Sequence, residues 1–175
     1  VRPPNDWKRT TLRDAWHKGG SGNALATKHN LEYQGVEMTA GGPLDEKTWS
    51  KNCQFQLTLF EPTRCFLFLE ARNVKTDMRD VEGLQTEPDY PTMGFVVCKG
   101  KGYHTLLGPE PPEVLFTAPA KFGDGVYLEL GHLDPDEKYV VIPFTDEPGV
   151  EHEYALTLYT DLECEFVKID PTNNT

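Results

Sequence analysis

Residues 54–59 read Gln-Phe-Gln-Leu-Thr-Leu, and residues 65–69 read Cys-Phe-Leu-Phe-Leu. In the first stretch apolar and polar residues alternate, which is the period of a β-strand with one buried face. The second stretch is apolar on both faces, as is typical of a central strand. The turn residues Glu61-Pro62 separate the two stretches, so the pattern predicts consecutive strands of a sheet.

Similar short runs follow along the chain, separated by turns rich in proline, glycine and aspartate. No long segment between residues 53 and 169 has apolar residues at the spacing of an amphipathic helix. Without crossover helices the strands must pair antiparallel, so the pattern predicts an all-β sandwich of two antiparallel sheets. About nine strands are expected, the others being residues 94–99, 103–107, 114–117, 126–130, 139–144, 154–159 and 162–169.

The composition restricts the kind of protein. The 175 residues hold 17 Lys and Arg against 28 Asp and Glu, a formal net charge of −11. Nucleic acid and anionic bilayers repel such a chain at long range, so neither is an expected default partner. No apolar run approaches the roughly 20 residues of a transmembrane helix. The cysteines lack zinc-ligand spacing, and Cys65 and Cys98 lie in apolar runs where a thiol packs as a small hydrophobe.

The charge is unevenly distributed along the chain, which predicts a boundary near residue 34. Residues 1–30 carry six cations and two anions, and they include Gly19-Gly20-Ser21-Gly22. We expect an irregular basic arm or interdomain linker over residues 1–34, a sandwich over 35–170 and a tail over 171–175. No charged region followed by an apolar one is visible at the start, which favours a cytoplasmic location.

The long connection between two predicted strands, residues 76–91, is strongly acidic. Clustered carboxylates offer the hard oxygen ligands that Ca²⁺ prefers, and a cation would relieve their mutual repulsion. A second acidic turn lies near residue 135, and a solvated acidic surface without metal is the alternative for both. The candidate calcium ligands are Asp77, Asp80, Glu82, Glu87 and Asp89 in the connection and Asp134, Asp136 and Glu137 in the turn.

A short basic segment, Lys99-Gly100-Lys101-Gly102, follows one predicted strand. Lys99 and Lys101 are candidates for binding a phosphate or a lipid headgroup, and an ordinary solvated hairpin is the alternative. The chain has only two serines and lacks the Gly-x-Ser-x-Gly, His-Glu-x-x-His and phosphate-loop patterns. No catalytic residue is therefore assigned, and we expect the chain not to be an enzyme.

Two further stretches form a more specific pattern. The first runs from Thr39-Ala-Gly-Gly42 through Trp49 to Asn52-Cys-Gln-Phe55, and the second is residues 139–149, Tyr-Val-Val-Ile-Pro-Phe-Thr-Asp-Glu-Pro-Gly. Together they resemble domain III of the calpain large subunit, in which a proline stands in place of Cys53. The residues that match the family pattern are Gly41, Gly42, Trp49, Asn52, Phe55, Pro143, Pro148 and Gly149.

The resemblance implies an eight-stranded, C2-like sandwich that regulates a calcium-dependent cysteine protease without being catalytic. It implies that the acidic loop binds Ca²⁺ and, through it, anionic phospholipid, or that the loop docks on the papain-like protease core of the parent chain. Recruitment from the cytoplasm to membranes is part of the same expectation. Two alternatives remain open: a metal-independent protein-interaction module and, more distantly, an extracellular adhesion or carbohydrate-binding sandwich.

Overall fold

The computed structural model describes residues 3–19, 37–74 and 89–171. Within these ranges the chain forms nine β-strands and one short 3-10 helix, η2. No helix in this part of the chain is long and apolar enough to cross a membrane. The elements are β1 (Lys8–Trp16), η2 (Trp49–Lys51), β2 (Phe55–Leu59), β3 (Thr63–Arg72), β4 (Thr92–Lys99), β5 (Val114–Phe122), β6 (Gly125–Leu133), β7 (Tyr139–Thr145), β8 (His152–Thr160) and β9 (Cys164–Lys168).

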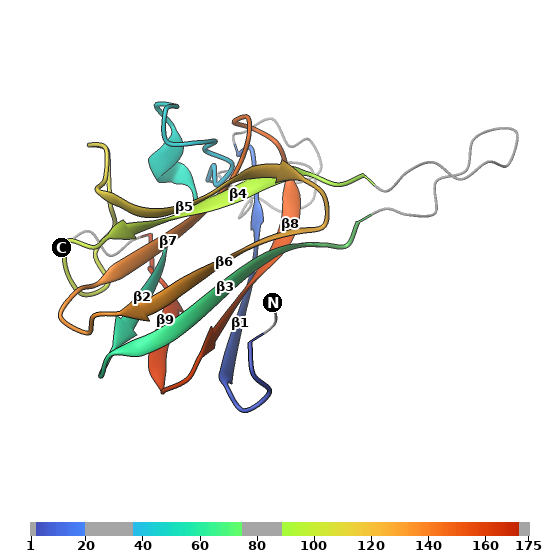
Figure 1. Ribbon diagram of the computed structural model, residues 1–175. Coiled ribbons are helices and arrows are strands. Elements are labelled where there is room, and N and C mark those ends of the chain that lie inside the picture. Colours follow the sequence, from blue (N-terminus) through green and yellow to red (C-terminus); the bar gives the residue numbers. More distant parts are fainter. Residues whose placement is uncertain (1–2, 20–36, 75–88, 172–175) are drawn as a thin grey trace, which may run out of the picture.

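The strands form two antiparallel sheets, which Figure 1 shows as the two layers of a sandwich. One sheet has the order β1-β8-β3-β6, and the other has the order β5-β4-β7-β2-β9. The predicted all-β antiparallel sandwich is therefore confirmed. The described residues contain nine strands, so the count of eight that the resemblance implied is wrong.

The main core lies between the two sheets. Alternate residues of β2 and β3 point into it, and Phe55, Leu57, Leu67 and Leu69 are at most 1% exposed. They pack with residues of β1, β4, β7 and β8 in one continuous cluster. Burying one such side chain contributes roughly 1.5–3 kcal/mol, so this interface between the sheets supplies most of the driving force for folding.

The outer face of the five-stranded sheet is buried as well. Val96 and Ile142, from two central strands of this sheet, form a second apolar cluster with Trp49 of η2 and Leu107 of a later loop. Consequently every residue of β7 is buried. The sequence pattern predicted this strand but not the layer that covers it.

Residues 103–107 form a loop, so the strand predicted there is wrong. The buried side chain of Gln54 donates to the Leu107 carbonyl at 2.9 Å and accepts from the Leu107 N–H at 2.8 Å. Gln56 bonds the loop backbone in a similar way. Its side-chain N–H donates to the Gly102 carbonyl at 2.7 Å, and its side-chain oxygen accepts from the His104 N–H at 2.7 Å. Because side-chain amides satisfy these backbone groups, the loop needs no partner strand. The polar face of β2 is thus buried under this loop.

The N-terminal segment departs from the expected irregular arm. Residues 8–16 form β1, which pairs antiparallel with β8 along its whole length. Trp16 at its end is fully buried, and its indole nitrogen donates to the Pro143 carbonyl at 3.2 Å. This part of the predicted arm is therefore an integral strand of the sandwich.

Candidate functional site

The two stretches that resemble the calpain pattern meet at one end of the sandwich. The side chain of Asn52 accepts from the Gly41 N–H at 2.9 Å and donates to the Gly42 carbonyl at 2.8 Å. The Gly149 N–H donates to the Ala40 carbonyl at 2.8 Å. We call this hydrogen-bonded cluster around residues 40–42 the glycine junction.

Both glycines of the junction are required by close packing. A Cβ on Gly41 would lie 2.1 Å from the Thr48 carbonyl oxygen, which is far inside van der Waals contact. Gly42 has a φ of +79°, and a Cβ there would lie 2.9 Å from the ring of Pro148. The junction is therefore sterically specific, and it fixes the segment before η2 against the turn after β7.

The remaining residues of the pattern have structural places too. Trp49 is buried in the outer apolar cluster, and Phe55 is buried in the main core. Pro143 pairs with Phe95 of β4, whereas the pairing of β7 with β2 stops at Val141. A proline lacks the N–H that a second ladder would use, so the ladder ends before it. These residues shape the scaffold and do not form a reactive centre.

Of the five carboxylates predicted in the long acidic connection, Asp89 is described. Asp77, Asp80, Glu82 and Glu87 lie outside the described residues. Asp89 is exposed and lines a hollow of about 370 Å³ together with side chains of β8 and the segments flanking it.

Two further carboxylates line this hollow, Glu151 and Glu153, which the sequence analysis did not select. Each has a local partner, because Glu151 accepts from the Lys18 N–H at 3.1 Å and Glu153 accepts from the Asn73 side chain at 2.6 Å. Their spacing by two residues at the start of β8 was visible in the sequence, but their place in one hollow with Asp89 depends on the tertiary structure. We call Asp89, Glu151 and Glu153 the acidic hollow.

The second acidic turn lies at the other end of the sandwich. Residues 134–137 directly precede β7, whose first residue, Tyr139, is the partner of Lys99 at the end of β4. Asp89 precedes the start of β4, and eight strand residues span about 25 Å. Asp134, Asp136 and Glu137 therefore do not join Asp89 in one site. Among the described residues, no group of three or more His, Cys, Asp or Glu side chains is arranged to hold a metal ion.

The predicted basic site meets this acidic turn. The Lys99 ammonium lies 3.5 Å from a Glu137 carboxylate oxygen and 4.0 Å from one of Glu113. Lys101 is exposed nearby in the loop that follows β4. An anionic headgroup at Lys99 would have to compete with two carboxylates, so this pair of lysines offers little net positive charge.

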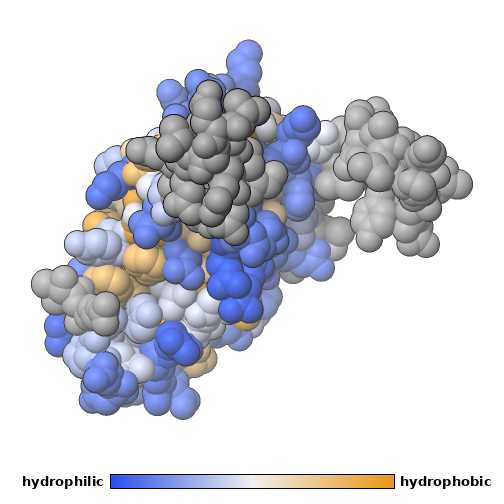
Figure 2. Space-filling view, turned by 90° about the vertical axis from the view of Figure 1, so that its right-hand side faces the viewer, coloured by the Kyte–Doolittle hydropathy of each residue, from blue (hydrophilic) through white to orange (hydrophobic). Residues whose placement is uncertain are grey.

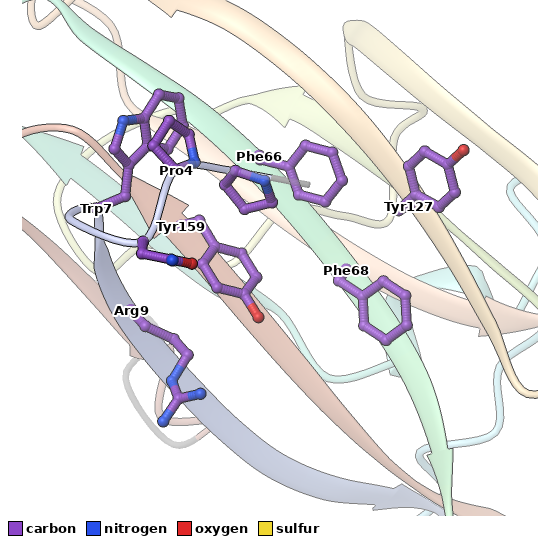
Figure 3. A pocket seen from close by; sticks show the side chains of 9 residues that line it. Pro4, Trp7, Arg9, Phe66, Phe68, Tyr127 and Tyr159 are labelled. Atoms are coloured by element: carbon purple, nitrogen blue, oxygen red, sulfur yellow. The ribbon is translucent and has the colours of Figure 1, made fainter. Parts of the chain in front are cut away.

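A groove lies on the outer face of the four-stranded sheet, and Figure 3 shows the side chains that line it. Its volume is about 780 Å³, which is large enough for a peptide segment. Phe66 stacks on Tyr127 with ring centroids 5.5 Å apart and meets Tyr159 edge to face at 6.1 Å. We call this the aromatic groove, and its principal lining residues are Trp7, Arg9, Phe66, Phe68, Tyr127 and Tyr159.

Three of the four cysteines are packed in the interior and are unsuited to act as nucleophiles. Cys53, Cys65 and Cys98 are buried, as predicted for the latter two. Burial raises the pKa of Cys65 to about 12, and it raises the pKa of Cys98 to about 12. A thiol reacts as its thiolate, so these side chains act as small apolar groups.

We expect Cys65 and Cys98 to resist iodoacetamide in the folded protein at pH 8. With a pKa of about 12, only about one thiol in ten thousand is ionised at that pH. The pKa difference also makes stability depend on pH, because the folded protein holds the thiol proton more tightly than the unfolded chain, whose thiol pKa is 9.0. The stabilisation from the buried neutral thiol is complete below about pH 9 and is lost as the pH rises towards 12. Peptide mass spectrometry after alkylation, with a urea-unfolded control, measures the labelling; rapid native labelling of either residue would contradict the prediction.

Comparison with known proteins gives one informative similarity. No family model matches the chain. Over 147 residues the chain is 26% identical to a protein of Dictyostelium discoideum named serine/threonine-protein kinase 4 homolog B. The aligned region covers 78% of this chain but 12% of that protein. The chain thus spans a small part of the length of the relative that it matches.

Proposed function

We propose that the chain is a non-catalytic regulatory sandwich of a larger cytoplasmic protein, similar to domain III of a calpain-like cysteine protease. In this proposal positive charge, from Ca²⁺ or from a lysine-bearing neighbouring domain, neutralises the acidic connection after β3. Calcium would also allow contact with anionic phospholipid, by bridging carboxylates and headgroups.

The observation that carries the proposal is the glycine junction. The two stretches that carry the resemblance are far apart in sequence, yet Asn52 and Gly149 bond to the same three-residue segment. A chance match of two short motifs would not require them to be neighbours in the fold. The alignment to a small part of a much longer protein is also consistent with a module.

The acidic hollow supports the electrostatic part of the proposal. Asp89, Glu151 and Glu153 line one depression at the end of β3 from which the acidic connection leaves. Carboxylates held close together favour a bound cation because their repulsion is then relieved. Arg72, His17 and His152 line the same hollow, and the described carboxylates are not arranged to hold a metal ion by themselves, so the positive partner in this proposal acts chiefly on the acidic connection.

A metal-independent interaction module is the second candidate, and the aromatic groove favours it. Surfaces with exposed aromatic side chains are common where proteins meet. Tyr127 is 58% exposed on an edge strand and stacks on Phe66, which holds the ring in place. This face does not depend on a cation.

Calcium should stabilise the chain if the first candidate is right. At one hundred times the dissociation constant, binding contributes about 2.7 kcal/mol, which corresponds to a rise in melting temperature of about 5–10 °C for a chain of this length. Replacing Asp77 and Asp80 with asparagine should abolish the rise, as measured by differential scanning calorimetry with millimolar CaCl₂ or EDTA.

The pair Asp134→Asn and Asp136→Asn is the matched control, because it removes the same charge from the acidic turn before β7. It should leave the calcium response unchanged. A wild-type melting temperature that does not respond to calcium would favour the interaction module.

Liposome co-sedimentation tests the lipid contact. Release of peptides from casein by the chain alone would contradict the non-catalytic assignment.

A further inference from the structure

The outer face of the four-stranded sheet presents an ordered row of side chains. Arg9 of β1 is the register partner of Tyr159 of β8, and Tyr159 is the partner of Phe66 of β3. These residues alternate with the core residues of their strands, so all three point away from the core. The four-stranded sheet is about 14 Å wide from β1 to β6, and the row crosses its strands.

The chain itself shows what this row accommodates. Pro3 and Pro4 line the groove with Trp7 and Tyr159, and the Trp7 N–H donates to the Pro4 carbonyl at 3.1 Å, which closes a turn just before β1. Figure 3 shows Pro4 beside Trp7 at the groove. Proline rings stack well on aromatic faces, and a polyproline II segment loses little entropy when it binds.

The polar groups at the groove select the charge of an occupant. Arg9 lines it, and the guanidinium of Arg64 lies 5.3 Å from the centroid of the Trp7 ring. Positive charge is therefore gathered on the β1 side of the row, whereas Glu129 of β6, the register partner of Phe66, is exposed on the other side. This combination complements a segment that carries both prolines and carboxylates.

A sugar is a poorer match for the same rings. Flat saccharides need amide or carboxylate side chains beside the aromatic face to bond their hydroxyls. Among the residues that line the groove, Asn5 is the single amide and there is no carboxylate.

We propose that the aromatic groove is a docking site for an acidic, proline-rich segment of another protein, which binds as a polyproline II helix across the four strands β1, β8, β3 and β6. At 3.1 Å per residue, four to five residues of such a helix span the width of the sheet. The segment displaces Pro3 and Pro4, so the chain's own prolines act as an internal competitor. This site lies on the face of the sheet and is separate from the acidic hollow of the proposed calcium function.

The test uses the 175-residue chain and the synthetic peptide (Pro-Pro-Glu)₄, with (Pro-Pro-Lys)₄ and (Gly-Ser-Glu)₄ as controls. Trp16 and Trp49 are buried, so a change in tryptophan fluorescence on titration reports Trp7. We expect the acidic proline peptide to bind in the presence of EDTA and both control peptides to bind at least about tenfold more weakly.

Variants identify the groove as the place of binding. Tyr127→Ala should weaken binding by about tenfold or more, as for an interface hot spot, whereas Tyr103→Ala, which removes a similarly exposed ring in the loop after β4, should not. Arg9→Glu should reverse the preference towards the lysine peptide, and joint replacement of Pro3 and Pro4 with alanine should tighten binding. Arg9 is exposed, so its reversal tests the proposal without a change in folding.

Three outcomes would overturn the proposal. One is no binding of the acidic proline peptide at millimolar concentration, and another is binding that Arg9→Glu and Tyr127→Ala leave unchanged. The third is a groove that takes a different occupant while the peptide does not bind. Such an occupant would be a second copy of the chain, seen as concentration-dependent dimerisation in analytical ultracentrifugation, or a glucose oligomer. In either case Tyr127→Ala would abolish the association. An unchanged peptide affinity after replacement of both prolines would contradict their role as competitor.

Discussion

Replacing Gly41 with alanine should destabilise the protein by at least about 3 kcal/mol, because a methyl group cannot be accommodated in the glycine junction. The added carbon would lie 2.1 Å from the Thr48 carbonyl oxygen and 3.1 Å from the Asn52 nitrogen. Both neighbours are backbone atoms, so relief requires movement of the chain and breaks the bonds that Asn52 makes. The melting temperature should fall by about 6–12 °C, as measured by calorimetry or circular dichroism.

Gly131→Ala is the matched control for this prediction. Gly131 has a φ of +70°, but a Cβ there would meet nothing within 4 Å. Its replacement therefore measures backbone strain alone, which is about 1 kcal/mol. If the two variants were equally stable, the close packing of the glycine junction would not be a determinant of the fold.

Replacing Trp16 with alanine should cost about 3–5 kcal/mol, the usual range for removal of a large aromatic side chain from a core. Trp16 is fully buried, its ring lies 4.2 Å from that of Tyr154, and its indole N–H bonds the Pro143 carbonyl. Urea unfolding monitored by circular dichroism measures the loss, and the slope of the transition shows whether the variant still unfolds as one unit.

The exposed residue Arg13 on the same strand supplies the control. Arg13→Ala should change stability by no more than about 0.5 kcal/mol, since it removes no buried group. The stability lost by Trp16→Phe should lie between the losses of Arg13→Ala and Trp16→Ala. The phenylalanine keeps an aromatic ring but leaves the Pro143 carbonyl without the indole donor. If Trp16→Ala unfolded like the wild type, β1 would be a dispensable arm, as the charge distribution alone had indicated.

These two predictions concern the scaffold on which both proposed sites depend. β1 carries Arg9 of the aromatic groove, and the segment after it leads to His17 and Lys18 beside the acidic hollow. Figure 2 views the molecule from one side, where hydrophobic residues gather on the left and hydrophilic residues predominate on the right. Loss of β1 would affect both sites.

Most strands could be predicted from the sequence because alternation is a local property of the chain. Residues 55–59 and 139–144 were predicted to within one residue of β2 and β7. β1 was missed because apolar and polar residues do not alternate along it: the positions in step with Leu12 and Trp16 include the polar Thr10 and Asp14. Residues 103–107 were assigned to a strand in error because their backbone groups bond the buried side chains of Gln54 and Gln56 instead of a neighbouring strand.

The candidate sites were less predictable, since they depend on which ends of strands meet. The acidic turn at Asp134 looked like a partner of the acidic connection, but an antiparallel fold places it beside Lys99 at the other end of β4. Phe66 and Phe68 were identified as strand residues only. Their role in a surface groove follows from their pairing with β8 and β6.

The amino-acid sequence by itself determined the class of fold, the places of most turns and the strong negative charge, because period and composition act over a few residues. Only the tertiary structure decided that Asn52 and Gly149 both bond residues 40–42, that Glu151 and Glu153 line one hollow with Asp89, and that aromatic residues from β3, β6 and β8 share one face. The physical reason is that strand order results from burying two sheets against each other, and this long-range choice has no signature in the spacing of residues along one strand.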